Sequence, residues 1–245
     1  MISWKRFARM DAETLESILA IAMGKPSKIS ASMMCANAFA LSEGLQRLED
    51  GDVEYLHMDV MDGHFVPNLG MSIDTMKSIR RRTAIPFDFH IMAFEPDSIV
   101  PLLEPREGDI VTIHVESTAQ IQRTIERTRR FGCKVFAALN PATSLMALDE
   151  LVHYVDGVNL MMVNPGFAGQ KMSEPCIDKA RRLRGFLKER GRGSIDVEVD
   201  GNISVEKARL LRGLGADIFV VGTSSIFVGD SISPEAISAL RAAIA

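Results

Sequence analysis

Eight short apolar runs, separated by longer amphipathic stretches, constrain the possible fold of this chain more than any other feature. Between the runs, stretches such as 72–82 and 174–190 carry apolar residues at every third or fourth position, as amphipathic helices do. This alternation is typical of repeated βα units that enclose a parallel sheet. The apolar runs lie near Ile29–Met34, Tyr55–Met61, Phe87–Ile91, Ile110–Val115, Lys134–Leu139, Gly157–Val163, Ile195–Asp200 and Ile218–Val221.

Polar residues inside the runs distinguish a barrel from an open doubly wound sheet, which also alternates strands and helices. In Ile195–Asp200 the acidic residues alternate with apolar ones, so one face of the strand is polar. Helices cover both faces of an open parallel sheet, whereas a barrel with an active site at its C-terminal mouth accommodates polar side chains inside. The chain of 245 residues therefore predicts a single α/β domain, a (β/α)8 TIM barrel, over residues 28–245.

The first 27 residues are predicted to form an amphipathic helical extension that ends near Gly24 and Pro26. Its segment Met10–Met23 is a candidate helix for oligomerisation or for binding a partner. Acidic residues interrupt its apolar positions, and no stretch of the chain approaches the roughly 18 apolar residues of a membrane span. We therefore expect no membrane association.

Charge and cysteine content narrow the possible partners. Lys and Arg total 28 against 32 Asp and Glu, and this balance argues against general affinity for nucleic acid or acidic lipid. An anionic substrate would need a local site. Cys35, Cys133 and Cys176 show no short pairing, so the sequence suggests neither a disulfide framework nor a Cys-based zinc site, and it fits a reducing cytoplasm.

The segment from His57 to Asn68 carries the most informative chemistry. Side chains alternate along a strand, so His57 and Asp59 share a face, which we expect to point into the barrel near the end of the strand. The next run adds His90. Two imidazoles and a carboxylate from neighbouring strands suit zinc, iron or manganese, and Asp200 can complete four ligands. One strand histidine is more often a hydrogen-bonded core residue, but three such polar residues near strand ends favour a metal site.

Met61, Met92 and Met161 also lie near the ends of predicted strands. By composition alone they are core residues, because methionine fills irregular gaps well. If they line the mouth of the barrel, they form an apolar wall around the reacting carbons of a substrate.

Loops rich in small residues follow the last three predicted strands, at Val163–Gln170, Asp200–Asn202 and Val221–Ser225. Small residues let backbone N–H groups approach phosphate oxygens, and a short helix predicted to start at Ser224 would add the positive end of its dipole. A single glycine-rich turn is weak evidence, but three in succession after the final strands of a barrel predict a phosphate site.

Together these segments closely resemble the ribulose-phosphate 3-epimerase family. The similarity covers nearly the whole barrel and includes, in order, HMDVMDGHFVPN, FHIM, IHVE, LNPATS, MMVNPGFAGQ, VEVDGN and VVGTSS. The resemblance implies a ribulose-phosphate-binding (β/α)8 barrel, one divalent metal ion (Zn²⁺, Fe²⁺ or Mn²⁺) per subunit, a homo-oligomer, and interconversion of D-ribulose 5-phosphate with D-xylulose 5-phosphate. The enzyme would be an isomerase that acts on a small ketose phosphate.

Carried over by motif, the resemblance assigns the metal ligands to His57, Asp59, His90 and Asp200. Asp59 and Asp200 are also the two catalytic acids, which would transfer protons on opposite faces of a cis-enediolate without an organic cofactor. His114 and Glu116 are rated as support residues. The candidate substrate-binding residues are Ser32, Met61, His90, Met92, Met161, Gly166, Phe167, Ala168, Gly169, Gly201, Asn202, Gly222 and Thr223.

Three departures from the family pattern leave the substrate open. Many pentose-phosphate members have an acidic residue near the end of the loop that reads Cys35-Ala36-Asn37 here, and they usually have Gly in place of Ala168 and Asn202. The GFAG and GTS segments are similar to the branch that acts on D-allulose 6-phosphate, which makes a hexose phosphate the alternative substrate.

Two other functions are compatible with a phosphate-binding barrel. A decarboxylase of the orotidine-phosphate type would need a lysine beside its carboxylates, in a pattern such as Asp-x-Lys-x-x-Asp, and the matching segment from Asp59 to Asp62 has none. A non-catalytic barrel that binds phosphate should have lost a metal ligand or an acid, and none is missing.

Overall fold

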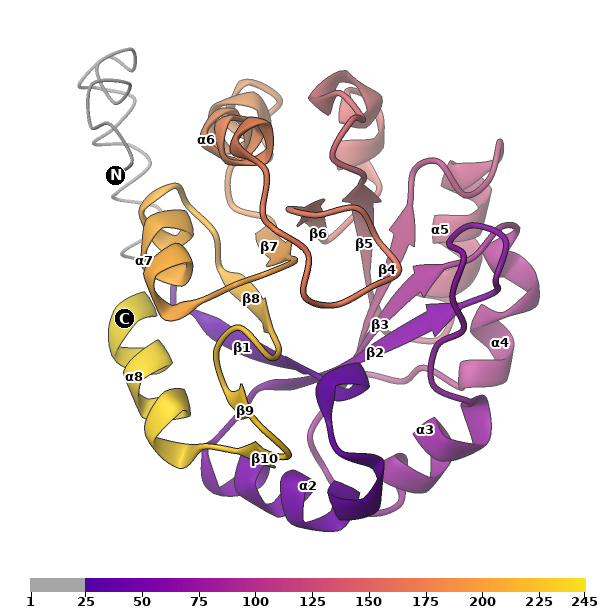
Figure 1. The fold of residues 1–245 in the computed structure, drawn as a ribbon. Helices are drawn as coiled ribbons and strands as arrows, with labels where there is room; N and C mark the ends of the chain where they lie inside the picture. The colour runs from indigo at the N-terminus through magenta and orange to yellow at the C-terminus, as the bar shows by residue number, and fades with distance from the viewer. Residues whose placement is uncertain (1–24) are drawn as a thin grey trace.

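Eight parallel strands close into a barrel in the computed structural model of the protein, which describes residues 25–245 (Figure 1). Each strand is hydrogen bonded to the next, and β8 returns to β1 with Val221 opposite Ala31. The predicted (β/α)8 barrel is confirmed, and the observed strand ends differ from the predicted ones by at most two residues. The strands are β1 Lys28–Ser32, β2 Tyr55–Met61, β3 Phe87–Met92, β4 Ile110–His114, β5 Lys134–Leu139, β6 Gly157–Met161, β7 Asp196–Asp200 and β8 Ile218–Val221.

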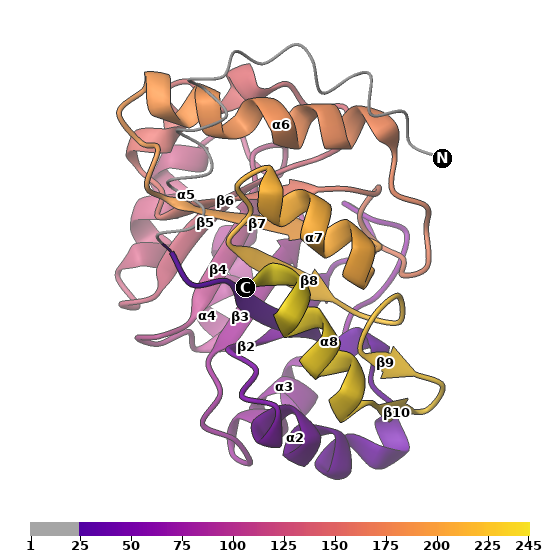
Figure 2. The same ribbon diagram turned by 90° about the vertical axis from the view of Figure 1, so that its left-hand side faces the viewer.

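Seven α-helices are described outside the strands; Figure 2 shows α6, α7 and α8 along one side of the barrel. Between β5 and β6 the chain forms two 3₁₀ turns, Leu145–Leu148 and Leu151–His153, instead of an α-helix. A short hairpin, β9 Phe227–Val228 with β10 Ser231–Ile232, precedes the last helix. The helices are α2 Leu41–Asp50, α3 Ile73–Arg80, α4 Val100–Leu103, α5 Ile121–Arg129, α6 Glu174–Glu189, α7 Val205–Gly213 and α8 Pro234–Ile244.

A layer of large side chains fills the N-terminal half of the barrel. Tyr55, Ile110, Phe136 and Ile218 are buried in contact with one another inside the ring of strands. Gly157 leaves room for this layer, because a Cβ atom there would lie 2.5 Å from the Phe136 ring. The barrel is therefore a packed core at this end rather than an open channel.

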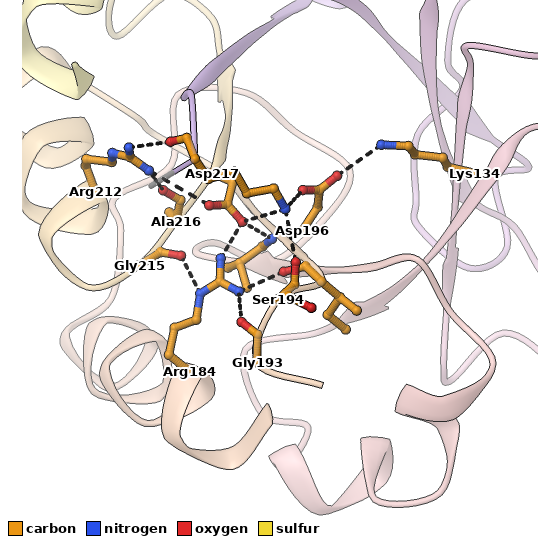
Figure 3. A network of polar contacts seen from close by, with 12 residues as sticks. Lys134, Arg184, Gly193, Ser194, Asp196, Arg212, Gly215, Ala216 and Asp217 are labelled. Carbon is orange, nitrogen blue, oxygen red and sulfur yellow. Dashed lines mark hydrogen bonds and ion pairs between the residues drawn. The ribbon is translucent and has the colours of Figure 1, made fainter. Parts of the chain in front are cut away.

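The N-terminal end of the barrel is stabilised by a buried polar network (Figure 3). Arg184 of α6 donates to the main-chain oxygens of Gly193, Ile195 and Gly215 and forms an ion pair with Asp217. Asp217 also accepts the N–H of Val197 at 2.9 Å. The network thus joins α6 to the starts of β7 and β8.

Lys25 forms an ion pair with Asp196, so the first described residues lie against this same end of the barrel. The predicted helical extension falls almost wholly on residues 1–24, which lie outside the described residues. No helix within 25–245 is both long enough and apolar enough to cross a membrane.

Candidate active site

Four predicted metal ligands converge from strands β2, β3 and β7. The Nε2 atom of His57 lies 3.5 Å from Oδ1 of Asp59 and 3.7 Å from Oδ2 of Asp200. The Nδ1 atom of His90 lies 3.7 Å from Oδ1 of Asp59 and 3.3 Å from Oδ2 of Asp200. Both carboxylates therefore approach both imidazoles at one point inside the barrel.

These separations fit a metal ion. Two ligand atoms bonded to one tetrahedral zinc ion at about 2.0–2.1 Å lie about 3.3–3.4 Å from each other. His57 Nε2 and His90 Nδ1 are fully buried, and neither has a hydrogen-bond partner within the described chain. A buried polar atom without a partner is unfavourable unless a ligand occupies the site, so these two nitrogen atoms are suited to coordinate a cation.

Hydrogen bonds to the other ring nitrogens orient both lone pairs toward this point. Nδ1 of His57 lies 2.7 Å from Oδ2 of Asp88, a carboxylate that only accepts, so Nδ1 carries the proton and Nε2 is free. Nε2 of His90 lies 2.8 Å from Nε2 of His114, whose Nδ1 lies 3.3 Å from Oε2 of Glu116. When His114 donates to Glu116, it accepts from His90, and Nδ1 of His90 is left free for a cation.

The pKa shifts agree with this arrangement. Burial lowers the pKa of His114 to about 4, so its ring is neutral and can accept the hydrogen bond from His90. Burial acts to raise the pKa of Glu116, but hydrogen bonds from His114 and Thr143 outweigh it and lower the pKa to about 2. Both residues lie behind His90, because His114 contacts His90 directly and Glu116 contacts His114.

Carboxylates dominate the electrostatics of the cluster. Burial acts to lower the pKa of His57, but the negative charges of Asp88 and Asp59 outweigh it and raise the pKa well above its ordinary value. Burial acts to raise the pKa of Asp59, but His57 and His90 hold the pKa of that carboxyl below its usual range. A field that favours a proton here also favours a metal cation in its place.

Sequence reasoning missed Asp88, which the structure places directly behind His57. Its Oδ2 atom also accepts a hydrogen bond of 2.8 Å from Ser30, and all three side chains are fully buried. The sequence does indicate that Asp88 points inward, because Asp88 and His90 are two residues apart in β3 and therefore share the inner face of the barrel. Glu198 of β7 lies in the same interior, where burial and the charge of Asp88 raise its pKa well above the ordinary value.

A cavity opens above the four converging side chains, at the C-terminal ends of the strands. Asp59 and Asp200 reach its wall, whereas His57 and His90 are fully buried beneath it. The predicted substrate-binding residues other than His90 all line this one cavity: Ser32, Met61, Met92, Met161, Gly166, Phe167, Ala168, Gly169, Gly201, Asn202, Gly222 and Thr223. The three methionines thus lie at the mouth of the barrel rather than in its outer core.

Close packing explains three of the four glycines that the loops after β6, β7 and β8 bring to the wall. Added Cβ atoms would lie 2.9 Å from Val66 at Gly166, 2.6 Å from Val163 at Gly201, and 2.8 Å from the Cys35 sulfur at Gly222. Gly166 and Gly201 also have φ angles of 110° and 118°, which only glycine adopts readily. Each position brings bare backbone to the cavity, as a site for phosphate oxygens requires.

The short helix predicted to start at Ser224 is wrong. Residues 223–226 form a turn in which the N–H groups of Ser225 and Phe227 both donate to the oxygen of Gly222. The chain then enters the β9–β10 hairpin, where Phe227 pairs with Ile232 and is buried. Hairpin pairing and burial of Phe227 therefore prevent a helix, and no helix dipole points into the cavity from this loop.

The fold and the site together define a (β/α)8-barrel enzyme with a buried His/Asp cluster beneath a glycine-lined cavity. The sequence profile described as the Ribulose-phosphate 3 epimerase family matches residues 28–227. The chain belongs to this family.

Individual relatives agree with this assignment. The chain is 35% identical over 214 residues to ribulose-phosphate 3-epimerase of Bacillus subtilis, a match that covers 87% of this chain and 98% of the relative. It is 38% identical over 205 residues to the enzyme of that name from Methanocaldococcus jannaschii, with coverage of 84% and 86%.

Solved structures of lower identity show the shared fold alone. The structure of 3-keto-L-gulonate-6-phosphate decarboxylase from Vibrio cholerae has a TM-score of 0.67 at 12% identity, covering 90% of this chain and 97% of that one. That of 3-hexulose-6-phosphate synthase has a TM-score of 0.61 at 14% identity, covering 89% and 100%.

Proposed function

We propose that this isomerase interconverts D-ribulose 5-phosphate and D-xylulose 5-phosphate by inverting the configuration at C3. Membership of the ribulose-phosphate 3 epimerase family supports the class of reaction, and the relatives named above support the pentose substrate. The GFAG and GTS segments, which are similar to the D-allulose 6-phosphate branch, keep the hexose phosphate as the alternative to be tested.

The observation that carries the proposal is the placement of Asp59 and Asp200. They come from β2 and β7, both reach the cavity wall, and each has a carboxylate oxygen within 3.7 Å of the same two imidazoles. Inversion at a carbon beside a ketone needs one group to remove a proton and another to return a proton to the opposite face. We assign these two roles to Asp59 and Asp200, which exchange them in the reverse direction.

His57, Asp59, His90 and Asp200 would hold one divalent ion, of zinc, iron or manganese. The ion supplies stabilisation of the negative charge that builds up on the substrate oxygens as C3 loses its proton. Asp88 and the His114–Glu116 pair hold the two imidazoles in the orientation that presents their lone pairs.

The remaining wall suits a ketose phosphate. Ser32 donates to Oδ2 of Asp59 at 3.1 Å and so fixes the orientation of that carboxylate beside the substrate. The methionines provide an apolar surface for the carbon chain, and the backbone at Gly166–Gly169, Gly201 and Gly222 is accessible to phosphate oxygens.

Substrate choice is tested by measuring kcat/KM of the metal-loaded enzyme for D-ribulose 5-phosphate and for D-allulose 6-phosphate. We expect a higher kcat/KM for the pentose phosphate, and a much lower one for D-ribulose without its phosphate. A preference for the hexose phosphate would move the protein to the alternative branch. Absence of turnover with both phosphates would contradict the proposed function.

A further inference from the structure

The charged side chains that line the cavity, among the residues that the structure describes, are Asp59 and Asp200. Neither Lys nor Arg from residues 25–245 lines it. Asp59 and Asp200 are assigned to the proposed metal ion, so the phosphate group needs favourable charge from elsewhere in the site. Backbone N–H groups supply part of it, and a cation placed just behind the wall would supply more.

Lys207 provides a cation directly behind the wall. Its Nζ atom lies 2.6 Å from Oδ1 and 3.2 Å from the main-chain oxygen of Asn202, which lines the cavity. Both acceptors are neutral amide oxygens, so no carboxylate cancels the charge of the ammonium group at these contacts. Lys207 is also held at its backbone, because its N–H donates to the side chain of Ser204 at the start of α7.

Asn202 connects this lysine to the loop after β6. Its backbone has a φ of 55°, a left-handed conformation that is uncommon for residues other than glycine. In this conformation its Nδ2 donates to the main-chain oxygen of Gln170, while its Oδ1 accepts from Lys207.

The side chain of Gln170 stabilises the loop after β6 by hydrogen bonds within that loop. Its Nε2 donates to the main-chain oxygens of Asn164 at 2.6 Å and Phe167 at 2.9 Å. Hydrogen bonds therefore run without interruption from the ammonium group of Lys207 to the glycine-lined loop of the candidate phosphate site. This arrangement depends on a side chain at position 202, where glycine would offer neither contact.

We propose that Lys207 is a positioning residue for the phosphate group of the substrate, acting through Asn202 and Gln170. It fixes the loop after β6 in the conformation that presents backbone N–H groups, and it supplies positive charge behind a cavity wall to which no Lys or Arg of residues 25–245 contributes. The inference rests on the proposed function, since it concerns the phosphate of that substrate. It predicts an effect on binding of the phosphate group and little effect on the chemistry at C3.

The test compares Lys207→Met with Lys207→Arg and with Arg209→Met, in the metal-loaded full chain. Arg209 is exposed on the same helix, so Arg209→Met removes one positive charge from α7 without touching Asn202. The measurements are KM and kcat for D-ribulose 5-phosphate, and the dissociation constant of inorganic phosphate by calorimetry. Asn202→Gly is a second variant, because glycine keeps the left-handed backbone and removes the side-chain contacts.

We expect Lys207→Met and Asn202→Gly to raise KM and the phosphate dissociation constant by about tenfold, with kcat changed by less than about twofold. Lys207→Arg should recover part of the affinity, and Arg209→Met should leave it unchanged. Unchanged phosphate affinity in Lys207→Met, or an equal loss in Arg209→Met, would overturn the inference.

Failure of the proposed function gives a different result. A wild-type protein that turned over neither ketose phosphate would overturn the proposed reaction. Calorimetry with inorganic phosphate would still decide the role of Lys207, since it needs no turnover.

Discussion

The Oδ2 atom of Asp88 lies 2.7 Å from Nδ1 of His57, and both side chains are fully buried inside the barrel. The contact fixes the imidazole so that Nε2 faces Asp59 and Asp200. A carboxylate behind a metal-binding histidine both orients the ring and increases its basicity. Asp88 is thus as much a part of the proposed metal site as the residues that would touch the ion.

We therefore expect Asp88→Asn to weaken metal binding by about 10- to 100-fold. Competition with a chromophoric chelator measures this change directly and does not depend on catalysis. Asp50→Asn is the matched control, since Asp50 is an exposed acid at the end of α2. Equal metal affinity in Asp88→Asn and the wild type would show that the contact does not support a metal ligand.

Removing the metal should affect both activity and stability. Dialysis against a chelator is expected to reduce kcat/KM by at least about a hundredfold, because the charge that develops on the substrate oxygens loses its counter-ion. Tm should also fall. An ion that binds only the folded state raises the free energy of unfolding by about 2.7 kcal/mol when its concentration is a hundred times Kd, and dialysis removes this stabilisation. Adding Zn²⁺, Fe²⁺ or Mn²⁺ should restore both quantities. If activity and Tm were the same before and after dialysis, metal dependence would be rejected.

Gly222 should tolerate alanine only poorly. An added Cβ would lie 2.8 Å from the Cys35 sulfur, and relief of this contact would move the wall of the cavity. We expect Gly222→Ala to raise KM by about tenfold. The double variant Cys35→Ala with Gly222→Ala should show a smaller rise relative to Cys35→Ala alone, because the clashing sulfur is gone. Equal effects of Gly222→Ala in both backgrounds would argue against the steric explanation.

Arg184→Met should destabilise the fold without altering the chemistry. Arg184 and Asp217 are 2% and 1% exposed, so removing the guanidinium group leaves a buried carboxylate without its main partner. Loss of one member of a buried ion pair costs about 3–5 kcal/mol. Urea unfolding measures the change, and Arg182→Met, which alters an exposed arginine on the same helix, should change stability by less than about 0.5 kcal/mol. A similar stability in both variants would contradict the importance of the pair.

The sequence predicted the barrel well because the alternation of strands and helices depends on short-range periodicity. Alternation along β2, β3 and β7 placed His57, His90 and Asp200 on inner faces, and the closed barrel then brought those faces together. The ends of the strands were predicted less accurately. The run predicted to reach Met34, for example, ends at Ser32, because Met33–Cys35 forms a 3₁₀ turn.

The contacts that the sequence did not predict join segments far apart in the chain. Asp88 supports His57 across 31 residues, and the Asn202 side chain donates to the main-chain oxygen of Gln170 across 32 residues. The strand pattern places Asp88 on the inner face but does not say which side chain it contacts, and the pattern says nothing of contacts between loops. The missing helix at Ser224 has a similar cause. Pairing of Phe227 with Ile232 and burial of the Phe227 ring override the local preference of the loop.

The most direct test of the account follows the proton at C3 by NMR, with D-ribulose 5-phosphate in deuterated water and with the wild type, Asp59→Asn and Asp200→Asn as enzymes. We predict that the wild type forms D-xylulose 5-phosphate with deuterium at C3, and that each variant loses at least about a hundredfold in turnover. Metal content is measured alongside, so that loss of an acid is distinguished from loss of the ion. Near-normal turnover in both variants, or product without deuterium at C3, would contradict proton transfer by Asp59 and Asp200.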